Sequence, residues 1–134
     1  MSIADLKRLL QKKGGFEQYI GTQIKQMEED NIVLELPITP VLLNYNNTLH
    51  GGVYAVILDT VIGMTLRARS EHPLVTVNLN INYLAPIKEG EKIVATAKIL
   101  NLGNSILTGE GEVRDISGNI LAKAIGTFKM IRPR

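Results

Sequence analysis

The residue best placed to do chemistry in this 134-residue chain is Asp59, which interrupts the longest nearly apolar stretch, Val53 to Leu66. A carboxylate buried among apolar residues must be hydrogen-bonded or paired, or else its pKa shifts and it becomes neutral. Catalytic bases occur in such surroundings, although a structural aspartate bonded to a loop amide would give the same pattern. Asp59 is therefore our first candidate for a catalytic residue.

A second candidate feature is His50-Gly51-Gly52, which directly precedes the same apolar stretch. Glycines at a helix start let the backbone approach a ligand, and the first N–H groups there have no partner within the helix. Those N–H groups and the helix dipole suit an oxygen atom that gains negative charge during a reaction. The plain alternative is a tight turn into the helix, with His50 hydrogen-bonded to a nearby carbonyl.

Two polar residues near these features are weaker candidates. Asn44 lies in the loop before the apolar stretch, where Asn46 and Asn47 are equally eligible. Thr76 lies in a strand pattern after it, where a residue of high strand propensity needs no functional reason. Neither residue indicates a site by itself.

The sequence lacks the parts of several other enzyme classes. It has no cysteine, which excludes a disulfide framework, a thiolate nucleophile and a cysteine-bound metal. Its two histidines, His50 and His72, form no zinc-binding motif, and no serine lies in a G-x-S-x-G turn. No phosphate-binding glycine loop is present. We therefore expect no metal ion and no other cofactor.

The composition is that of one soluble domain covering residues 1–134. Hydrophobic residues make up 45%, charged residues 21%, and the net charge is only +2. Aromatic residues amount to 4%, with no tryptophan, so we expect no nucleic-acid partner. The N-terminus lacks the apolar core of a signal peptide, and no stretch is long enough to span a bilayer. We expect a cytoplasmic protein that does not bind membranes.

Hydrophobic periodicity predicts an α+β fold. Helical spacing predicts a helix over 2–13, ended by Gly14-Gly15, and a long helix over about 51–69. Alternation predicts strands over 19–29 and 31–36 before the long helix, and over 75–82, 91–101, 106–115 and 119–131 after it. One apolar helix followed by a strand meander indicates an antiparallel sheet wrapped around that helix. A second subunit commonly covers the surface and edges of so small a sheet.

The strand over 75–82 is expected to have two different faces, because successive side chains in a strand point to opposite sides. Its apolar face would carry Val75, Val77, Leu79 and Ile81. Its polar face would carry Thr76, Asn78, Asn80 and Asn82.

Together, these features resemble the hotdog-fold acyl-CoA thioesterases, in particular the phenylacetate-degradation (PaaI-type) subgroup. The spacings from the loop asparagine to the histidine and from the histidine to the aspartate match the family's, as does the order of strands and helix. The resemblance covers nearly the whole chain and implies a hotdog fold, thioester hydrolysis and an acyl-CoA substrate. The matching pattern is Asn44, Thr48-Leu49-His50-Gly51-Gly52, Leu58-Asp59, Asn80-x-x-Tyr83-Leu84-x-Pro86 and Gly90-Glu91.

The resemblance also implies roles for individual residues. It makes Asp59 the general base or nucleophile of thioester hydrolysis. It makes Gly51 and Gly52 the amide donors to the thioester oxygen. It gives Asn44 the task of orienting the attacking water, and Thr76 that of assisting this water through its hydroxyl.

Three other positions are interpreted through the same family. His50 is expected to hold the loop rather than to transfer protons. Asn47 stands where relatives often have glycine, and we expect the turn to survive because asparagine tolerates a left-handed backbone. Asn78 stands where many relatives have an acidic residue, so its role is open.

Contacts to the rest of the substrate are predicted less directly. The loop residues Asn104 and Ser105 are candidates to bind the substrate, and the nearby Lys98 or Arg67 could meet the phosphates of CoA. Candidate pocket residues are Tyr54, Met64, Leu66 and Tyr83.

The positions of Gly52 and Asp59 predict a dimer without help from the resemblance. The two residues lie seven positions apart on one predicted helix, which separates them by about 10 Å. One thioester carbonyl cannot bind the Gly52 N–H and also meet water held by Asp59 of the same helix. If both residues act, they belong to different subunits of a homodimer with two equivalent sites. The family often pairs such dimers into tetramers, and we expect a dimer of dimers here.

Two other functions remain open. One is a non-catalytic hotdog module that binds or senses acyl-CoA, against which the retained Asp59 argues. The other is a hydratase or dehydratase of the same fold, in which a histidine and a carboxylate form the acid–base pair, as His50 and Asp59 could. Hydration of an enoyl-CoA, or tight binding without turnover, would distinguish these functions from hydrolysis.

Overall fold

The structure is a computed structural model that describes residues 2–13 and 15–134. Its helices and strands follow the predicted order, with two short helical segments added, and the predicted α+β class is confirmed. In chain order the elements are α1 (Ile3–Lys13), α2 (Phe16–Tyr19), β1 (Gln23–Glu28), β2 (Asn31–Pro37), η1 (Pro40–Leu42), α3 (Gly51–Arg67), β3 (Leu74–Tyr83), β4 (Lys92–Leu102), β5 (Ile106–Asp115) and β6 (Ile120–Met130).

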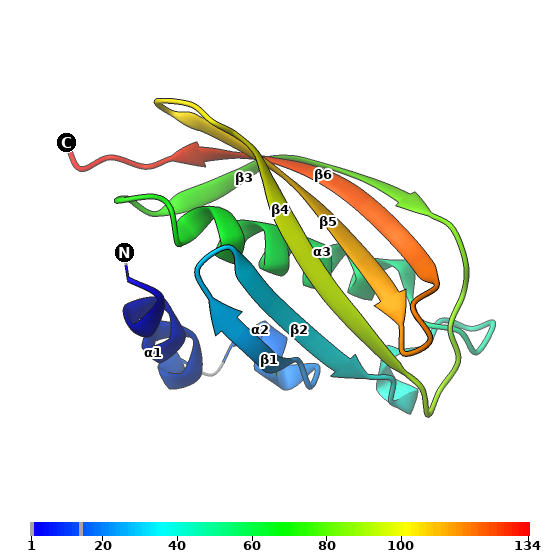
Figure 1. Cartoon of the computed structure of the whole chain (residues 1–134). Helices are drawn as coiled ribbons and strands as arrows, with labels where there is room; N and C mark the ends of the chain where they lie inside the picture. The colour runs from blue at the N-terminus through cyan, green and yellow to red at the C-terminus, as the bar shows by residue number, and fades with distance from the viewer. Residues whose placement is uncertain (1, 14) are drawn as a thin grey trace.

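The strands form one antiparallel sheet in the order β1-β2-β4-β5-β6-β3. Figure 1 shows this sheet curving around α3, which lies against its inner face, while α1 lies beside β1 and α2 contacts α3. The predicted sheet wrapped around one long helix is therefore confirmed. The edges of the sheet are β1 and β3.

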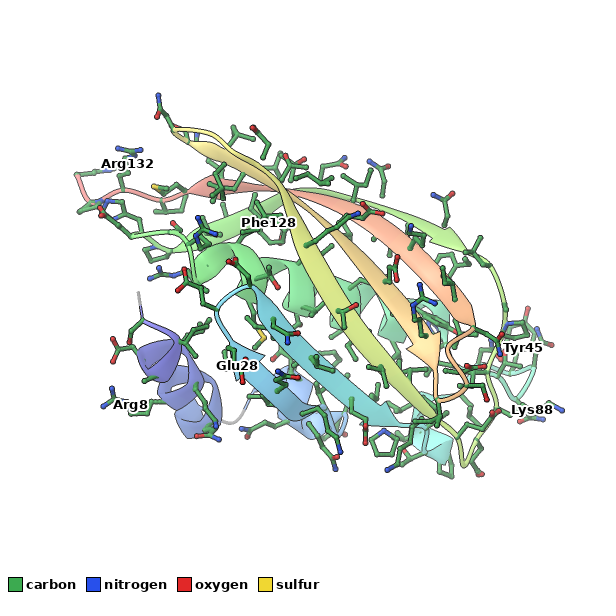
Figure 2. All side chains as sticks on the ribbon, in the orientation of Figure 1. Arg8, Glu28, Tyr45, Lys88, Phe128 and Arg132 are labelled. Carbon is green, nitrogen blue, oxygen red and sulfur yellow. The ribbon has the colours of Figure 1, made fainter. Side chains whose placement is uncertain are left out.

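The apolar character of α3 follows from its place inside the curved sheet. The strands approach it closely at glycines. A Cβ atom at Gly109 or at Gly111 would lie only 2.9 Å from the Ile62 side chain. Phe128 packs between β6 and α3, where Figure 2 labels it. Within the described residues, no helix is both long and apolar enough to cross a membrane. The buried residues of α3 are Tyr54, Ile57, Leu58, Val61, Ile62, Met64, Thr65 and Leu66.

Two boundaries differ from the predictions by two residues or more. The region predicted as one strand over 19–29 starts with the end of α2, and β1 begins only at Gln23, because Gly21 makes a turn with φ of +97°. The long helix ends at Arg67 rather than at residue 69, because the N–H groups of Arg69 and Ser70 bond to carbonyls three residues back. The predicted helix end at Gly14 lies outside the described residues.

Strand β3 contradicts the predicted two-faced pattern. Its register against β6 shifts between Thr76 and Asn78, where Val77 is an extra residue that forms a β-bulge. Thr76, before the bulge, pairs with the buried Phe128, and Leu79, after it, pairs with Gly126, which faces α3. Thr76 and Leu79 therefore share the inner face, and the prediction that Thr76 lies on the opposite face is wrong. One inserted residue reverses the alternation because the side-chain period is two.

Candidate active site

The bulge in β3 brings Thr76 to Asp59 of α3. The Thr76 hydroxyl donates a hydrogen bond to Asp59 Oδ1 over 2.7 Å. Asp59 is half-buried rather than fully buried. Its other oxygen, Oδ2, accepts no hydrogen bond from the residues that the structure describes. The carboxylate is thus fixed through one oxygen, while the other can take a proton or attack a carbon atom.

Asp59 and Thr76 line a cleft of about 300 Å³. Its floor is α3, and its walls come from the start of β3, from β6 and from the N-terminal helices. Such a largely apolar cleft with few polar groups suits an apolar substituent next to a reacting carbonyl. The other lining residues are Leu6, Glu17, Thr60, Gly63, Met64, Arg67, Pro73, Leu74 and Phe128.

The N-terminal helices contribute residues to this cleft that sequence reasoning missed. Leu6 of α1 is 3% exposed, and Glu17 of α2 accepts a hydrogen bond from the Thr60 hydroxyl over 3.1 Å. The apolar spacing in the first helix marks Leu6 as a residue of the buried face. It does not tell which surface Leu6 contacts, so its position near Asp59 was not predictable.

His50 holds the start of α3. It is the N-cap residue, and its Nδ1 accepts a hydrogen bond from the Gly52 N–H over 2.8 Å. Its carbonyl accepts the Val53 N–H over 2.9 Å. The partner of the ring is thus an amide of the helix start and not the nearby carbonyl considered above. A ring nitrogen that accepts a hydrogen bond carries no proton, so this contact needs neutral His50.

Tyr83 closes over the first turn of the same helix. Its hydroxyl donates to the Gly51 carbonyl over 2.8 Å, and its ring meets Tyr54 edge-on, with 5.6 Å between the ring centroids. Tyr54 in turn donates to the Ala85 carbonyl over 3.2 Å. Burial raises the pKa of Tyr54 to about 12, and nearby Tyr83 adds to the effect. Tyr54 is therefore a protonated hydrogen-bond donor at neutral pH.

Asn44 organises the loop that leads to α3. Its Oδ1 accepts the N–H groups of Asn46 (2.9 Å) and Thr48 (3.1 Å), and its Nδ2 donates to Thr48 Oγ1 (3.0 Å). Asn47 adopts the left-handed conformation that we expected there, with φ of +62°. A side-chain amide has two N–H donors, so Asn44 can still offer one to a bound molecule.

The helix start borders a second cleft, of about 340 Å³, which shares no lining residue with the first. Within one chain, Asp59 and the Gly51 amide thus belong to different clefts. His50 is not among the residues that line the Asp59 cleft, so the two do not form an acid–base pair within one chain. The second cleft is lined by Asn44, Thr48, Leu49, Gly51, Tyr54, Tyr83, Leu84, Ala85 and Pro86.

The predicted substrate contacts Asn104 and Ser105 lie at the exposed tip between β4 and β5, and they line neither cleft. The Asn104 carbonyl accepts a hydrogen bond from Arg132, and the Ser105 carbonyl accepts the Met130 N–H over 2.8 Å. Within one chain, the structure does not bring them to either cleft.

The candidate pocket residues divide between the two clefts and the core. Met64 lines the Asp59 cleft, whereas Tyr54 and Tyr83 line the second cleft. Leu66 is completely buried and belongs to the hydrophobic core. Arg67, considered above as a contact for CoA phosphates, lines the Asp59 cleft.

Known proteins share both the sequence pattern and the fold. The family model described as "Thioesterase superfamily" matches residues 46–122, more than half of the chain. Acyl-coenzyme A thioesterase 13 of Homo sapiens is 28% identical over 125 residues, covering 91% of this chain and 89% of that protein. The E. coli PaaI protein from the phenylacetic acid degradation operon superposes with a TM-score of 0.90 at 20% identity, covering 97% of this chain and 94% of PaaI.

A hypothetical thioesterase from Streptococcus pneumoniae, solved with coenzyme A, has a TM-score of 0.78 at 21% identity, covering 85% of this chain and 91% of that chain. These solved structures share the hotdog fold, and the family match spans His50, both glycines, Asp59 and Thr76. The family and fold implied by the sequence are thereby confirmed. The chain belongs to the thioesterase superfamily and is a hotdog-fold enzyme of that family.

Proposed function

We propose that the protein hydrolyses acyl-CoA thioesters to a free acid and CoA, with Asp59 as the catalytic carboxylate. The observation that carries this proposal is the Asp59 carboxylate, oriented by Thr76 beside a largely apolar cleft. The name of the human relative and the coenzyme A in the pneumococcal structure support acyl-CoA as the substrate class. We place the reaction in the cytoplasm.

In the proposed reaction, Asp59 takes a proton from a water molecule while the water oxygen attacks the thioester carbonyl carbon. The hydrogen bond from Thr76 keeps the carboxylate aimed at this water. The tetrahedral intermediate then breaks its C–S bond, and the CoA thiolate leaves and takes up a proton. Direct attack by Oδ2 on the carbonyl carbon would instead break the C–S bond, release the CoA thiolate and leave a mixed anhydride, which water hydrolyses to the free acid and the Asp59 carboxylate. Both routes need only protein groups and water, so we propose no metal or redox cofactor.

The carbonyl oxygen gains negative charge and needs hydrogen-bond donors. We assign these to the Gly51 and Gly52 N–H groups of a second subunit, with Asn44 of the same loop orienting the water. Because the Gly52 N–H donates to His50 Nδ1, a bound carbonyl has to share or replace that acceptor. His50 thus acts by holding the donor in position and transfers no proton.

The two clefts form one complete site only if two copies of the chain pair. The edge strand β3 offers a surface for this pairing, since Val75, Val77 and Tyr83 on or beside its edge are 48%, 58% and 54% exposed. Exposed apolar residues and unpaired backbone groups on an edge strand favour association with another chain. We propose a symmetric dimer with two sites, and pairing of such dimers into a tetramer.

The test is release of free thiol from a panel of acyl-CoAs, with an enzyme-free blank and an enoyl-CoA hydration assay in parallel. We expect saturable thiol release, and the preferred acyl group names the substrate class. Hydration without thiol release would contradict the proposal in favour of a hydratase. Binding of acyl-CoA with no turnover would contradict it in favour of a non-catalytic module.

A further inference from the structure

The cleft that holds Asp59 continues along α3 away from the proposed reaction centre. The residues of α3 that line it are Asp59, Thr60, Gly63, Met64 and Arg67, which lie on one side of the helix. Asp59 and Arg67 are eight residues apart, which is about 12 Å along the helix axis. The cleft therefore has two ends, one with the carboxylate and one with a guanidinium.

The middle of this cleft is apolar. Leu6, Met64, Leu74 and Phe128 contribute apolar side chains between its two ends. Gly63 has no side chain to fill the space, and a Cβ atom there would lie 3.2 Å from the Phe128 ring. A chain of methylene groups can therefore lie along the cleft and lose its contact with water, which is favourable.

Arg67 brings an uncompensated positive charge to the far end. One of its N–H groups donates to the Ser70 carbonyl over 2.6 Å, which uses one of five donors. In the described part of the chain, no carboxylate lies within the 4 Å of a salt bridge to Arg67. Partial burial lowers the pKa of Arg67, although the group stays protonated. An anion bound beside it would offset this desolvation and use the remaining donors.

The acidic groups of the cleft lie at its other end. Glu17 accepts the hydroxyl of Thr60, the residue next to Asp59, and so sits about 10 Å along the helix from Arg67. A negative group at the Arg67 end would therefore lie close to the guanidinium and far from the carboxylates of Glu17 and Asp59. The charges of the cleft thus favour one orientation of an elongated anionic acyl group.

We propose that this enzyme prefers acyl groups that carry a carboxylate at the end opposite the thioester, and that Arg67 binds this carboxylate. The inference rests on the proposed function, because it requires the thioester carbonyl to lie at Asp59. An extended chain gains about 1.2 Å in length per bond. The distance of about 12 Å between Asp59 and Arg67 along the helix therefore suits medium-length dicarboxylic acyl groups such as suberoyl and sebacoyl.

The test compares substrates that differ only in the terminal carboxylate. Thiol release is measured with octanoyl-CoA against suberoyl-CoA and with decanoyl-CoA against sebacoyl-CoA. Each pair is measured on the wild type, Arg67→Met and Arg69→Met. Arg69 is a matched control because it lies two residues away, pairs with Asp30 over 3.1 Å, and lines no part of the cleft. Thermal unfolding of each variant checks whether losing the Arg67–Ser70 bond merely weakens the helix end.

We expect the wild type to have a higher kcat/KM for the dicarboxylic member of a pair. Arg67→Met should lower that value by about 10- to 100-fold, the range for a hydrogen bond to a charged group. It should lower the monocarboxylic value less, so that the ratio of the dicarboxylic to the monocarboxylic kcat/KM falls, and Arg69→Met should leave this ratio unchanged. Hydrolysis of the monocarboxylic substrates with no preference, or equal losses on both in Arg67→Met, would overturn this inference alone. Absence of all hydrolysis would overturn the proposed function together with it.

Discussion

The middle and the start of the central helix present different chemical groups. At its middle, the side chain of Asp59 faces a cleft and keeps one oxygen without a hydrogen-bond partner among the described residues. At its start, the useful groups are backbone amides, and one of them, the Gly52 N–H, is already bound by His50. In the proposed mechanism the carboxylate can therefore react as it stands, whereas the Gly52 N–H is held by His50 and a bound carbonyl would have to share that contact.

Under the proposed mechanism, neither part of the helix is a complete site. A carboxylate alone can activate water, but no hydrogen-bond donor then stabilises the negative charge that develops on the carbonyl oxygen in the transition state. Donors alone stabilise that charge, but no base then takes a proton from the water. The α-helix itself keeps the two apart by about 10 Å. In the dimer that we propose, the middle of one helix lies beside the start of the other, so that each site has both parts.

The largest effect is expected from Asp59→Asn, which keeps the shape of the side chain but removes the base. Turnover of the best acyl-CoA should fall by about 10²–10⁴-fold, the usual contribution of a positioned base. Steady-state thiol release measures the loss, and circular dichroism with gel filtration checks that fold and assembly persist. Turnover within about tenfold of the wild type would remove Asp59 from the mechanism.

A nearly equal loss of activity is expected from Gly52→Pro at the start of the helix. Proline removes the N–H, and it is tolerated in the first turn of a helix. Loss of one oxyanion donor costs about 10²–10³ in kcat. Gly52→Ala is the matched control, because it keeps the N–H while placing a Cβ 3.0 Å from His50 Nδ1. If both variants lose the same activity, crowding of His50 rather than the missing donor explains the effect.

A smaller loss is expected from Thr76→Val, which removes the 2.7 Å hydrogen bond to Asp59 and keeps the branched shape. A hydrogen bond to a charged group contributes about 1.5–3 kcal/mol, so kcat/KM should fall by about 10- to 100-fold. Thr60→Val is the control, since its hydroxyl donates to Glu17 in the same cleft and does not touch Asp59. Equal losses in the two variants would show that Thr76 has no special link to the carboxylate.

The smallest effect is expected from Tyr83→Phe, which removes the hydrogen bond to the Gly51 carbonyl but keeps the ring against Tyr54. A neutral hydrogen bond contributes about 0.5–1.5 kcal/mol, so activity should fall by no more than about tenfold. The loss should appear mainly in kcat, because the helix start is held less firmly. Tyr54→Phe is the control, because it removes the hydrogen bond to the Ala85 carbonyl instead. A loss of activity in Tyr83→Phe alone would come from the contact with Gly51.

Much of this arrangement follows from local sequence patterns. The long helix, the strands of the meander and the position of Asp59 within the helix all depend on apolar periodicity over short windows. His50, Gly51 and Gly52 stand at the helix start as predicted, because capping is also a local property.

The rest depends on contacts between segments that are far apart in the chain. Strict alternation put Thr76 on the wrong face, since no local signal marks the bulge at Val77. The positions of Leu6 and Glu17 beside α3 depend on how the N-terminal helices pack, which periodicity does not specify. For the same reason, Arg67 was assigned only a general role with phosphates, although it lies at the end of the Asp59 cleft.

The central claim is that one site takes Asp59 from one chain and the helix start from another. It is tested most directly by mixing Asp59→Asn with Gly52→Pro, each nearly inactive alone, under conditions that let subunits exchange. Half of the dimers should then be mixed, and each mixed dimer has one intact site, so thiol release should recover to about a quarter of the wild-type value. Mixed dimers that form, as shown by affinity tags, but stay as inactive as the separate variants would contradict a site shared between chains.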